Sequence, residues 1–468
     1  MSSIRIESDS IGIKEVPADA YYGVQSVRAL ENFSITGDRV HPEMIRSLAY
    51  LKKACAIANM RADNLDAVIG GAIVKACDRI IAGEFHDQFI VDPIQGGAGT
   101  SINMNANEVI ANVAIEILGG QLGDYSLVSP LDHVNRGQST NDVIPTAGKM
   151  TVISLLSGLG KSLTGLCRAF AQKSQEFDNI LKMGRTQMED AVPIRLGQEF
   201  LAYASATRRG LERIMKYEIE MHSINMGGTA IGTGINANQY YYDHIAEILS
   251  QVTDVPYIQA EDLIDATQNI DCFASISSAL KDCALTLSKI ASDLRLMGSG
   301  PKTGFGEIRL PAKQPGSSIM PGKVNPVIPE VVNQVAFRII GNDVAISFAV
   351  EAGQLELNAF EPVVFYSLFQ SIDFLRNAVD TFIVNCVNGI EANETRCEQL
   401  LEQSVGIVTA LNPYIGYTAS AALAKKALET GTPIRELVLR EGILTEEQMS
   451  QIMDPYRLTK PGFVKLKK

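Results

Sequence analysis

The chain has 468 residues, 46% of them hydrophobic and 20% charged, values that are ordinary for a folded protein with two or three domains and a large core. Its formal net charge of −12 and isoelectric point near 5.1 argue against nucleic acid or an anionic membrane as the partner. A site that binds an anion must therefore build its positive charge locally.

The number and spacing of the cysteines and the composition of the first residues indicate the cellular compartment in which the protein is expected. The seven cysteines are scattered, odd in number and free of C-x-x-C spacing, which is typical of buried thiols in a reducing environment. Residues 1–10 contain no apolar signal segment, and no run of about 18 uninterrupted apolar residues occurs. We expect a soluble, cytoplasmic protein without a membrane partner. The five histidines have no ligand-like spacing, so no metal site is predicted.

The first 140 residues are predicted to form an N-terminal domain of short helices and turns. Residues 17–23 have the composition of a turn, and residues 43–60 and 66–82 have helical patterns. A glycine-rich stretch then leads into an apolar helix over residues 109–118.

Residues 141–396 are predicted to form a central bundle of at least five long helices. Apolar residues recur every three or four positions for two to three heptads, the pattern of helices packed at shallow angles. The segments are 156–170, 276–297 and 368–386, together with the proline-free stretches 196–222 and 330–350. Several stripes are wider than a single partner needs, so part of this surface is expected to be buried between subunits.

Residues 397–468 are predicted to form a smaller, helical C-terminal domain. Thr445 followed by Gln448 is typical of a helix start, and the charged residues 464–468 are expected to form a solvated tail. The fold class is therefore mainly α, with a long central helical bundle flanked by two smaller, mostly helical domains.

The most informative stretch is residues 316–326, Gly-Ser-Ser-Ile-Met-Pro-Gly-Lys-Val-Asn-Pro. It places Ser317 and Ser318 near Lys323 and Asn325, in a loop that exposes backbone N–H groups. Such a loop can hold a carboxylate while a proton is taken from the neighbouring carbon. A generic Gly/Ser/Pro stretch is more often a flexible surface loop, so the other polar segments matter.

Three further segments carry short polar side chains on glycine-bearing loops. Residues 95–108 place Thr100 at a helix start, and residues 137–146 place Ser139, Thr140 and Asn141 at another. Residues 182–187 end in Thr186 and Gln187. Each segment alone is more often a structural cap. Four segments of one chemistry favour convergence on a single anion site.

Taken in their order along the chain, these four segments resemble the signature of the fumarase/aspartase superfamily. Its members eliminate a group from C2 of a succinyl-type substrate to leave fumarate. The resemblance covers essentially the whole chain and implies the fumarase/aspartase fold. It implies that Ser317 is the catalytic base and that each active site of a homotetramer is assembled from three subunits. By the same resemblance, Thr100, Ser139 and Thr140 would hold the β-carboxylate of the substrate, and Asn141 would contact the leaving group. Thr186, Lys323 and Asn325 would hold the α-carboxylate. Gln187 and Ser318 are also placed in the substrate site.

Details of the motifs favour the ammonia-eliminating branch of this family over the fumarases. Fumarases tend to have Thr-Gly-Ser-Gly-Thr where this chain has residues 96–100, and Ser-Ser-Asn-Asp where it has residues 139–142. Gln187 stands where fumarases and some aspartases carry histidine. A hydroxide leaving group must be protonated, whereas an ammonium group already carries its proton, so a neutral amide can suffice.

The sequence therefore predicts reversible trans-elimination of ammonia from L-aspartate, with a serine base and an aci-carboxylate intermediate. This chemistry requires neither a metal nor an organic cofactor, although a regulatory divalent cation stays open. Within the family, the alternatives are fumarate hydratase or a lyase for a substituted aspartate. Outside the enzymes, the alternative is a catalytically silent structural homologue.

Overall fold

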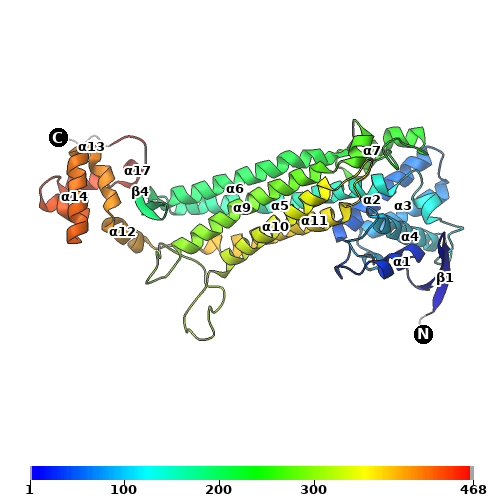
Figure 1. Ribbon diagram of the computed structural model, residues 1–468, viewed down its shortest axis with the longest axis horizontal. Coiled ribbons are helices and arrows are strands. Elements are labelled where there is room, and N and C mark those ends of the chain that lie inside the picture. The colour runs from blue at the N-terminus through cyan, green and yellow to red at the C-terminus, as the bar shows by residue number, and fades with distance from the viewer. Residues whose placement is uncertain (1–2, 464–468) are drawn as a thin grey trace. The chain divides into compact units, whose positions relative to one another are not determined.

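The computed structural model describes residues 3–463, so the expected tail at 464–468 lies outside the described part. Helices dominate the chain and the sheets are small two-stranded pairs, which confirms the mainly α class (Figure 1). Cα proximity divides the chain into two compact units. The first comprises residues 1–160, 212–282 and 338–375, and the second comprises 161–211, 283–337 and 376–468. The three-domain division at residues 140 and 396 stays a prediction.

Each of the five long helices runs through both units, with one part of its length in each. These helices correspond to the five segments for which long helices were predicted from the sequence. They are α5 (Thr140–Glu176), α6 (Leu196–Glu218), α9 (Asp271–Met297), α10 (Val327–Glu351) and α11 (Glu361–Asn385). By length and composition alone α5 could cross a membrane, but a core helix of a soluble protein passes the same test.

The first unit is built around helices that pack side by side. Helix α2 contacts α3 and α7, and α3 contacts α4 (Figure 1). The predicted helices at 43–60 and 66–82 are confirmed as α2 and α3, and Asp66 caps α3 by accepting bonds from the N–H groups of Val68 and Ile69. The elements of this unit are α1 (Val24–Asn32), α2 (Pro42–Arg61), α3 (Ala67–Ile81), α4 (Thr100–Ile117), α7 (Gln239–Thr253), α8 (Leu263–Gln268), β5 (Ser223–Ile224) and β6 (Ile258–Gln259).

The chain begins with an antiparallel hairpin, in which β1 (Ile4–Asp9) pairs with β2 (Gly12–Pro17). The hairpin has exposed apolar side chains, among them Ile4, Ile6 and Ile13 in the strands and Ile11 in the turn. Short helices with turns were expected in this region. That expectation is wrong for residues 4–17.

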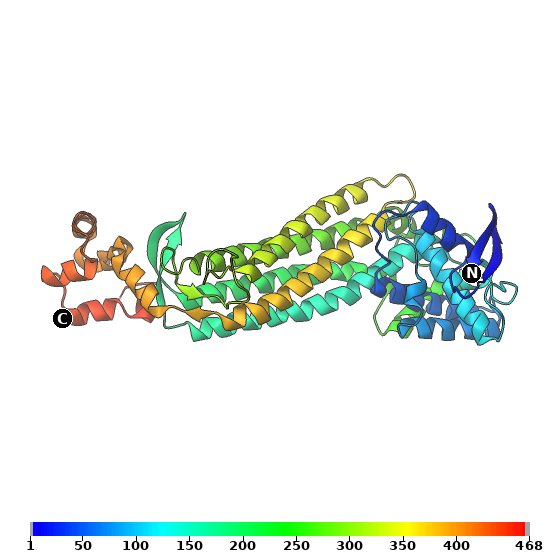
Figure 2. The same cartoon turned by 90° about the horizontal axis from the view of Figure 1, so that it is seen from below.

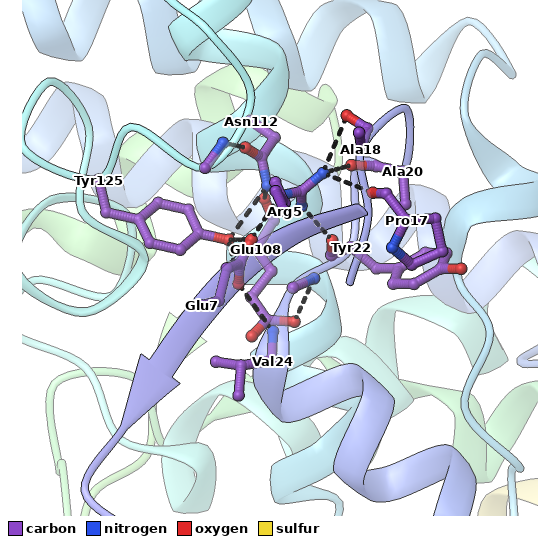
Figure 3. Close-up of polar contacts among 12 residues, drawn as sticks. Arg5, Glu7, Pro17, Ala18, Ala20, Tyr22, Val24, Glu108, Asn112 and Tyr125 are labelled. Atoms are coloured by element: carbon purple, nitrogen blue, oxygen red, sulfur yellow. Dashed lines mark hydrogen bonds and ion pairs between the residues drawn. The ribbon is translucent and has the colours of Figure 1, made fainter. Parts of the chain in front are cut away.

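A buried carboxylate of α4 holds the start of α1. Glu108 accepts bonds from the backbone N–H groups of Gly23 (2.8 Å), Gln25 (2.8 Å) and Ser26 (3.1 Å). Glu7 lies beside Glu108 and accepts from the Val24 N–H at 2.8 Å (Figure 3). These bonds satisfy donors that a helix start leaves unpaired. A Cβ at Gly23 would lie 2.6 Å from a Glu7 oxygen and 2.9 Å from Glu108, so only glycine allows both carboxylates to approach. The network ties α1 to the helix that begins at Thr100.

The second unit has an aromatic core at its long helices. Phe170 of α5 contacts Phe200 and Tyr203 of α6, with ring centroids 6.3 and 5.7 Å apart, and Phe382 of α11 at 6.1 Å. Phe177 contacts Phe200 at 5.2 Å, edge to face, the favoured arrangement for aromatic pairs.

Short helices of the second unit form a group of their own (Figure 2). Leu401, Leu411, Leu423, Leu437 and Met449 are buried together in its core. The predicted helix start at Thr445 is confirmed, because the Thr445 side chain and that of Gln448 form a reciprocal capping box. The elements are α12 (Glu394–Gln403), α13 (Asn412–Ile415), α14 (Tyr417–Thr430), α15 (Ile434–Arg440), α16 (Glu446–Ile452), α17 (Pro455–Leu458), β7 (Ile308–Arg309) and β8 (Glu391–Ala392).

Candidate active site

The predicted base lies in the loop that connects α9 to α10. Figure 1 shows this loop projecting away from the two helices. Its ends are closed by the Gly316 N–H, which donates to the Lys323 carbonyl at 2.7 Å, and by Asn325 Nδ2, which donates to the Gly316 carbonyl at 2.8 Å. A Cβ at Gly316 would lie 2.6 Å from the Lys323 oxygen, so this closure requires glycine.

Within the closed loop, the Ser317 hydroxyl oxygen accepts two backbone hydrogen bonds. The donors are the N–H groups of Ile319 (3.2 Å) and Met320 (3.0 Å). Dipoles aimed at this oxygen would stabilise negative charge on it. Ser317 is half-buried, whereas Ser318 and Lys323 are exposed, so the loop offers a hydroxyl, an ammonium group and backbone N–H groups on one short segment.

Thr186 and Gln187 lie in a hairpin, where a helix-flanking loop was expected. Strand β3 (Leu181–Thr186) pairs antiparallel with β4 (Glu189–Arg195), with an irregularity between Met183 and Arg185. Thr186 ends its strand and Gln187 forms the turn with a φ of 55°. The loop prediction is therefore wrong for residues 182–186, because cross-strand pairing decides this conformation.

Ion pairs hold the base of this hairpin. Arg185 contacts the fully buried carboxylate of Glu307 at 2.8 Å, and Lys182 lies 3.2 Å from Glu199 and 3.5 Å from Glu307. The Arg185 guanidinium also lies 4.1 Å from the ring centroid of Phe305. The strand that ends at Thr186 is therefore anchored to the segment that follows α9.

Thr100 is the first residue of α4, as the glycine-rich turn predicted. The turn reverses the chain with left-handed residues, at Gly97, Ala98 and Gly99. The Thr100 hydroxyl donates to the Gly97 carbonyl at 2.7 Å, and its side chain is exposed. For the anion-binding role expected of Thr100, its hydroxyl proton would have to turn away from the Gly97 carbonyl.

Ser139, Thr140 and Asn141 begin α5, as expected. The Ser139 hydroxyl accepts from the Asn141 N–H at 3.2 Å, and Thr140 Oγ1 accepts from Asn103 Nδ2 at 3.3 Å. A hydroxyl that accepts still has its own proton to donate. All three side chains are half-buried, so two hydroxyl donors and an amide are available at this helix start.

Sequence reasoning missed the glycine-rich loop over residues 225–236, which fixes this helix start. Asn141 Nδ2 donates to the Ala230 carbonyl at 2.7 Å, and Asn225 Nδ2 donates to the Asn141 carbonyl at 2.9 Å. The loop contains left-handed residues at Gly227, Thr229, Gly232, Gly234 and Asn236. Its four glycines within eight residues were a signal that could have identified it.

Asp142 ties the same loop to α5 from inside the protein. Its carboxylate is fully buried and accepts from the N–H groups of Ser139 (2.9 Å), Gly227 (3.2 Å) and Thr229 (3.0 Å). Burial raises the pKa of Asp142 to about 6, although these three hydrogen bonds act in the opposite direction.

The predicted site residues therefore fall into two sets. Thr100, Ser139, Thr140 and Asn141 belong to the first unit, at the starts of α4 and α5. Thr186, Gln187, Ser317, Ser318, Lys323 and Asn325 belong to the second unit, in a hairpin and a loop. The bond from Asn103 of α4 to Thr140 links the two helix starts of the first set. The second set supplies hydroxyl and amide groups and the ammonium group of Lys323 from two separate segments of its unit.

Comparison with known proteins identifies the class as a lyase. Residues 12–341 match the Lyase family, and residues 407–460 match the family described as fumarase C C-terminus. The chain belongs to the fumarase/aspartase superfamily, as the sequence motifs predicted.

Individual relatives cover nearly the whole chain. It is 55% identical to an aspartate ammonia-lyase of Bacillus sp, covering 98% of each chain, and 46% identical to that of Escherichia coli K12, covering 99% of this chain and 97% of the relative. A cobalt-bound fumarate lyase:delta crystallin structure from Brucella melitensis has a TM-score of 0.96 at 47% identity, covering 98% of this chain and 100% of the other. A class II fumarase from Schistosoma mansoni has a TM-score of 0.92 at 33% identity, with the same coverage.

Proposed function

We propose that this chain is a carbon–nitrogen lyase that catalyses the reversible deamination of L-aspartate to fumarate and ammonia. The observation that carries this proposal is identity of 46–55% to aspartate ammonia-lyases across essentially the full chain, compared with 33% to a class II fumarase. Gln187 supports nitrogen as the leaving atom, because an amide cannot protonate a departing hydroxide.

In the proposed mechanism, Ser317 removes a proton from C3 of aspartate. A free serine is a weak base, so its alkoxide needs stabilisation. The two backbone N–H groups that already point at Ser317 Oγ support this role. Both are supplied by the same short loop, which keeps them aimed at the oxygen while it is charged.

Charge from C3 would spread onto the β-carboxylate, giving an aci-carboxylate. Thr100, Ser139 and Thr140 would donate to its oxygens, and Asn141 would contact the amino group. Thr186, Lys323 and Asn325 would hold the α-carboxylate and orient the C–N bond for cleavage, with Gln187 and Ser318 completing the substrate contacts. The chemistry needs no organic cofactor and no metal at the reacting atoms, and a regulatory divalent cation stays open.

The proposed assembly is a homotetramer in the cytoplasm, with active sites shared between subunits. Helix α10 supports an intermolecular contact because it exposes large apolar side chains at Phe337 (64%), Val344 (50%) and Phe348 (70%). Their spacing of seven and four residues places them on one face of the helix. Apolar faces of this kind are typical of protein–protein interfaces.

The proposal is tested by measuring fumarate absorbance with L-aspartate and L-malate in parallel. We expect fumarate from aspartate and little from malate. Faster turnover of malate would make the protein a fumarase, and fumarate from neither substrate would favour a substituted aspartate or a silent homologue.

A further inference from the structure

A lysine lies fully buried beneath the start of α5. Lys52 of α2 is 0% exposed, and its ammonium group donates to Asn135 Oδ1 at 2.9 Å and to Gln138 Oε1 at 2.8 Å. Within residues 3–463, no carboxylate lies within 4.0 Å of this ammonium group, and both of its acceptors are neutral amides. A buried charge without a close counter-ion is unfavourable for stability, which points to a role in function.

Amide side chains lie around this ammonium group, and the hydrogen bonds among them fix which end of each amide is the nitrogen and which is the oxygen. We call Asn103, Asn107, Asn135 and Gln138 the amide cluster. Asn103 Nδ2 and Asn107 Nδ2 both donate to Asn135 Oδ1, each at 3.2 Å, beside the bond from Lys52. An ammonium group has donors only, so it requires an oxygen at Asn135 and at Gln138.

The orientation has an unfavourable consequence for two members of the cluster. Asn103 Oδ1 and Asn107 Oδ1 are buried and have no hydrogen-bond partner among the described residues. A buried, unpaired carbonyl oxygen is destabilising, so something must impose this arrangement. The ammonium group of Lys52 supplies this constraint. Because it can only donate, the Asn135 side chain must turn its oxygen toward it, and Asn103 and Asn107 must then turn their nitrogens toward the same oxygen.

The cluster ends at a predicted substrate contact. Asn103 Nδ2 also donates to Thr140 Oγ1 at 3.3 Å, which directs the Thr140 hydroxyl proton away from the cluster. We propose that Lys52 is a positioning residue: its ammonium group sets the direction of the amide cluster so that Thr140 presents a donor to the β-carboxylate. This inference rests on the role proposed above for Thr140.

The groups that face Lys52 titrate in different ranges. Burial lowers the pKa of Lys52 to about 8, since desolvation disfavours its charged form. The ionisable neighbours of Lys52 are Cys55 on the same helix, Cys77 of α3 and Asp142 of α5, and the Tyr241 hydroxyl of α7 lies 3.3 Å from the Cys55 sulfur. Burial raises the pKa of Asp142 to about 6 and that of Cys55 to about 12, and it also raises the pKa values of Cys77 and Tyr241 above their ordinary values. Loss of the Lys52 proton above pH 8 is therefore separable from these other titrations.

The first experiment compares Lys52→Met with Lys53→Met. Lys53 is the neighbouring lysine, and its ammonium group pairs with Asp78 at 2.6 Å away from the cluster. We expect Lys52→Met to lose roughly tenfold to hundredfold in kcat/KM for aspartate, because a transition-state donor is no longer oriented. Its Tm should be unchanged or higher, since an uncompensated buried charge is removed. Lys53→Met should keep wild-type activity. Wild-type kcat/KM in Lys52→Met would overturn the inference.

A double-mutant cycle distinguishes positioning from general support of the fold. If Lys52 acts through Thr140, adding Lys52→Met to Thr140→Val should lower kcat/KM by less than about threefold more. Two losses that multiply would overturn the inference. If wild type makes fumarate and Ser317→Ala does not, while Lys52→Met is normal, only this inference fails. Absence of wild-type turnover would reject the proposed function itself.

A third measurement does not depend on folding of Lys52→Met. Succinate is a suitable probe because it carries both carboxylates and no titrating amine. Its inhibition constant against wild type should be flat from pH 6.5 to 7.5 and rise about tenfold per pH unit above pH 8. Thr140→Val should lose most of this rise. A wild-type inhibition constant that stays flat to pH 9.5 would overturn the inference.

Discussion

At the scale of single residues, Ser317 and Lys323 lie on one loop and have different proposed roles, the first as the base and the second as a contact of the α-carboxylate. The Ser317 oxygen accepts two backbone N–H groups and is half-buried, whereas the Lys323 ammonium group is exposed to solvent. An exposed cation gains most when a bound dianion excludes water around it. The two residues should therefore fail in different ways when substituted.

Ser317→Ala should abolish turnover and leave succinate binding nearly intact, because the hydroxyl acts on the proton at C3 and not on a carboxylate. Kinetics with aspartate and inhibition by succinate measure the two effects. Ser318→Ala, one residue away, is the matched comparison: as a proposed substrate contact and not the base, it should lose only part of the activity and keep far more turnover than Ser317→Ala. If Ser317→Ala retains more than about a tenth of wild-type turnover, a loss below ~1.4 kcal/mol, the base lies elsewhere.

Lys323→Met should raise KM as well as lower kcat, because a bound carboxylate would lose its cation. Removing one partner of such a pair costs roughly 2–5 kcal/mol. Lys313→Met is the control, since Lys313 is exposed in the segment that also carries Lys323. Unchanged KM and kcat in Lys323→Met would show that this lysine makes no substrate contact.

At the scale of elements, the loop over residues 316–325 depends on a close backbone approach. Gly316 is bonded to the Lys323 carbonyl, and an added Cβ would also lie 2.9 Å from the Asn325 nitrogen. Contacts under 3.0 Å with backbone atoms force the chain to shift. The backbone geometry around Ser317 therefore depends on Gly316, which has no side chain that could take part in the reaction.

Gly316→Ala should lower kcat/KM by roughly tenfold or more, because a displacement of about 1 Å at the reacting groups can cost about a hundredfold in rate. Gly71→Ala in α3 is the control: it has open space for a Cβ and should keep activity, with stability equal or higher by about 0.5–1 kcal/mol. Wild-type activity in Gly316→Ala would mean that the closed loop is unnecessary.

The same loop should close over substrate. Hydrogen exchange across residues 312–325 is expected to slow when succinate binds, because closure would protect backbone N–H groups and bring Ser317 to C3. Identical exchange with and without succinate would reject closure. Exchange in α3 serves as an internal reference, since no change is expected there.

At the scale of the whole molecule, the predicted site residues lie on two compact units of one chain, which fits a site completed by other subunits. The exposed apolar face of α10 offers a surface for such an assembly. If the proposed tetramer completes each site, association of subunits is a condition for catalysis.

Mixing two inactive variants tests this idea. Co-refolding Ser317→Ala with Thr100→Ala subunits should restore part of the activity, because some sites in the mixed tetramer would contain only wild-type residues. Each variant refolded alone is the control. Absence of recovery, with subunit exchange shown by mass measurement, would place Ser317 and Thr100 of each site in one chain.

Local signals in the sequence were enough to predict the long helices, the Thr445 cap and the polar motifs. Apolar spacing specifies a helix because each turn buries the same face, and a cap depends on residues three positions apart. The loop at 316–325 was recognisable because its polar groups lie within ten consecutive residues. All these features are determined over one or a few helical turns.

Features that depend on strand pairing or on packing between elements were decided only by the three-dimensional structure. The hairpins at 4–17 and 181–195 form through cross-strand pairing, which apolar periodicity does not reveal. Lys52 looks like any helical lysine beside Lys53, yet packing against α3 and α7 buries one ammonium group, while the other stays paired with Asp78. Burial is a property of the assembled core, and it places a residue type that is ordinary at surfaces beneath the start of α5, where the substrate site is proposed.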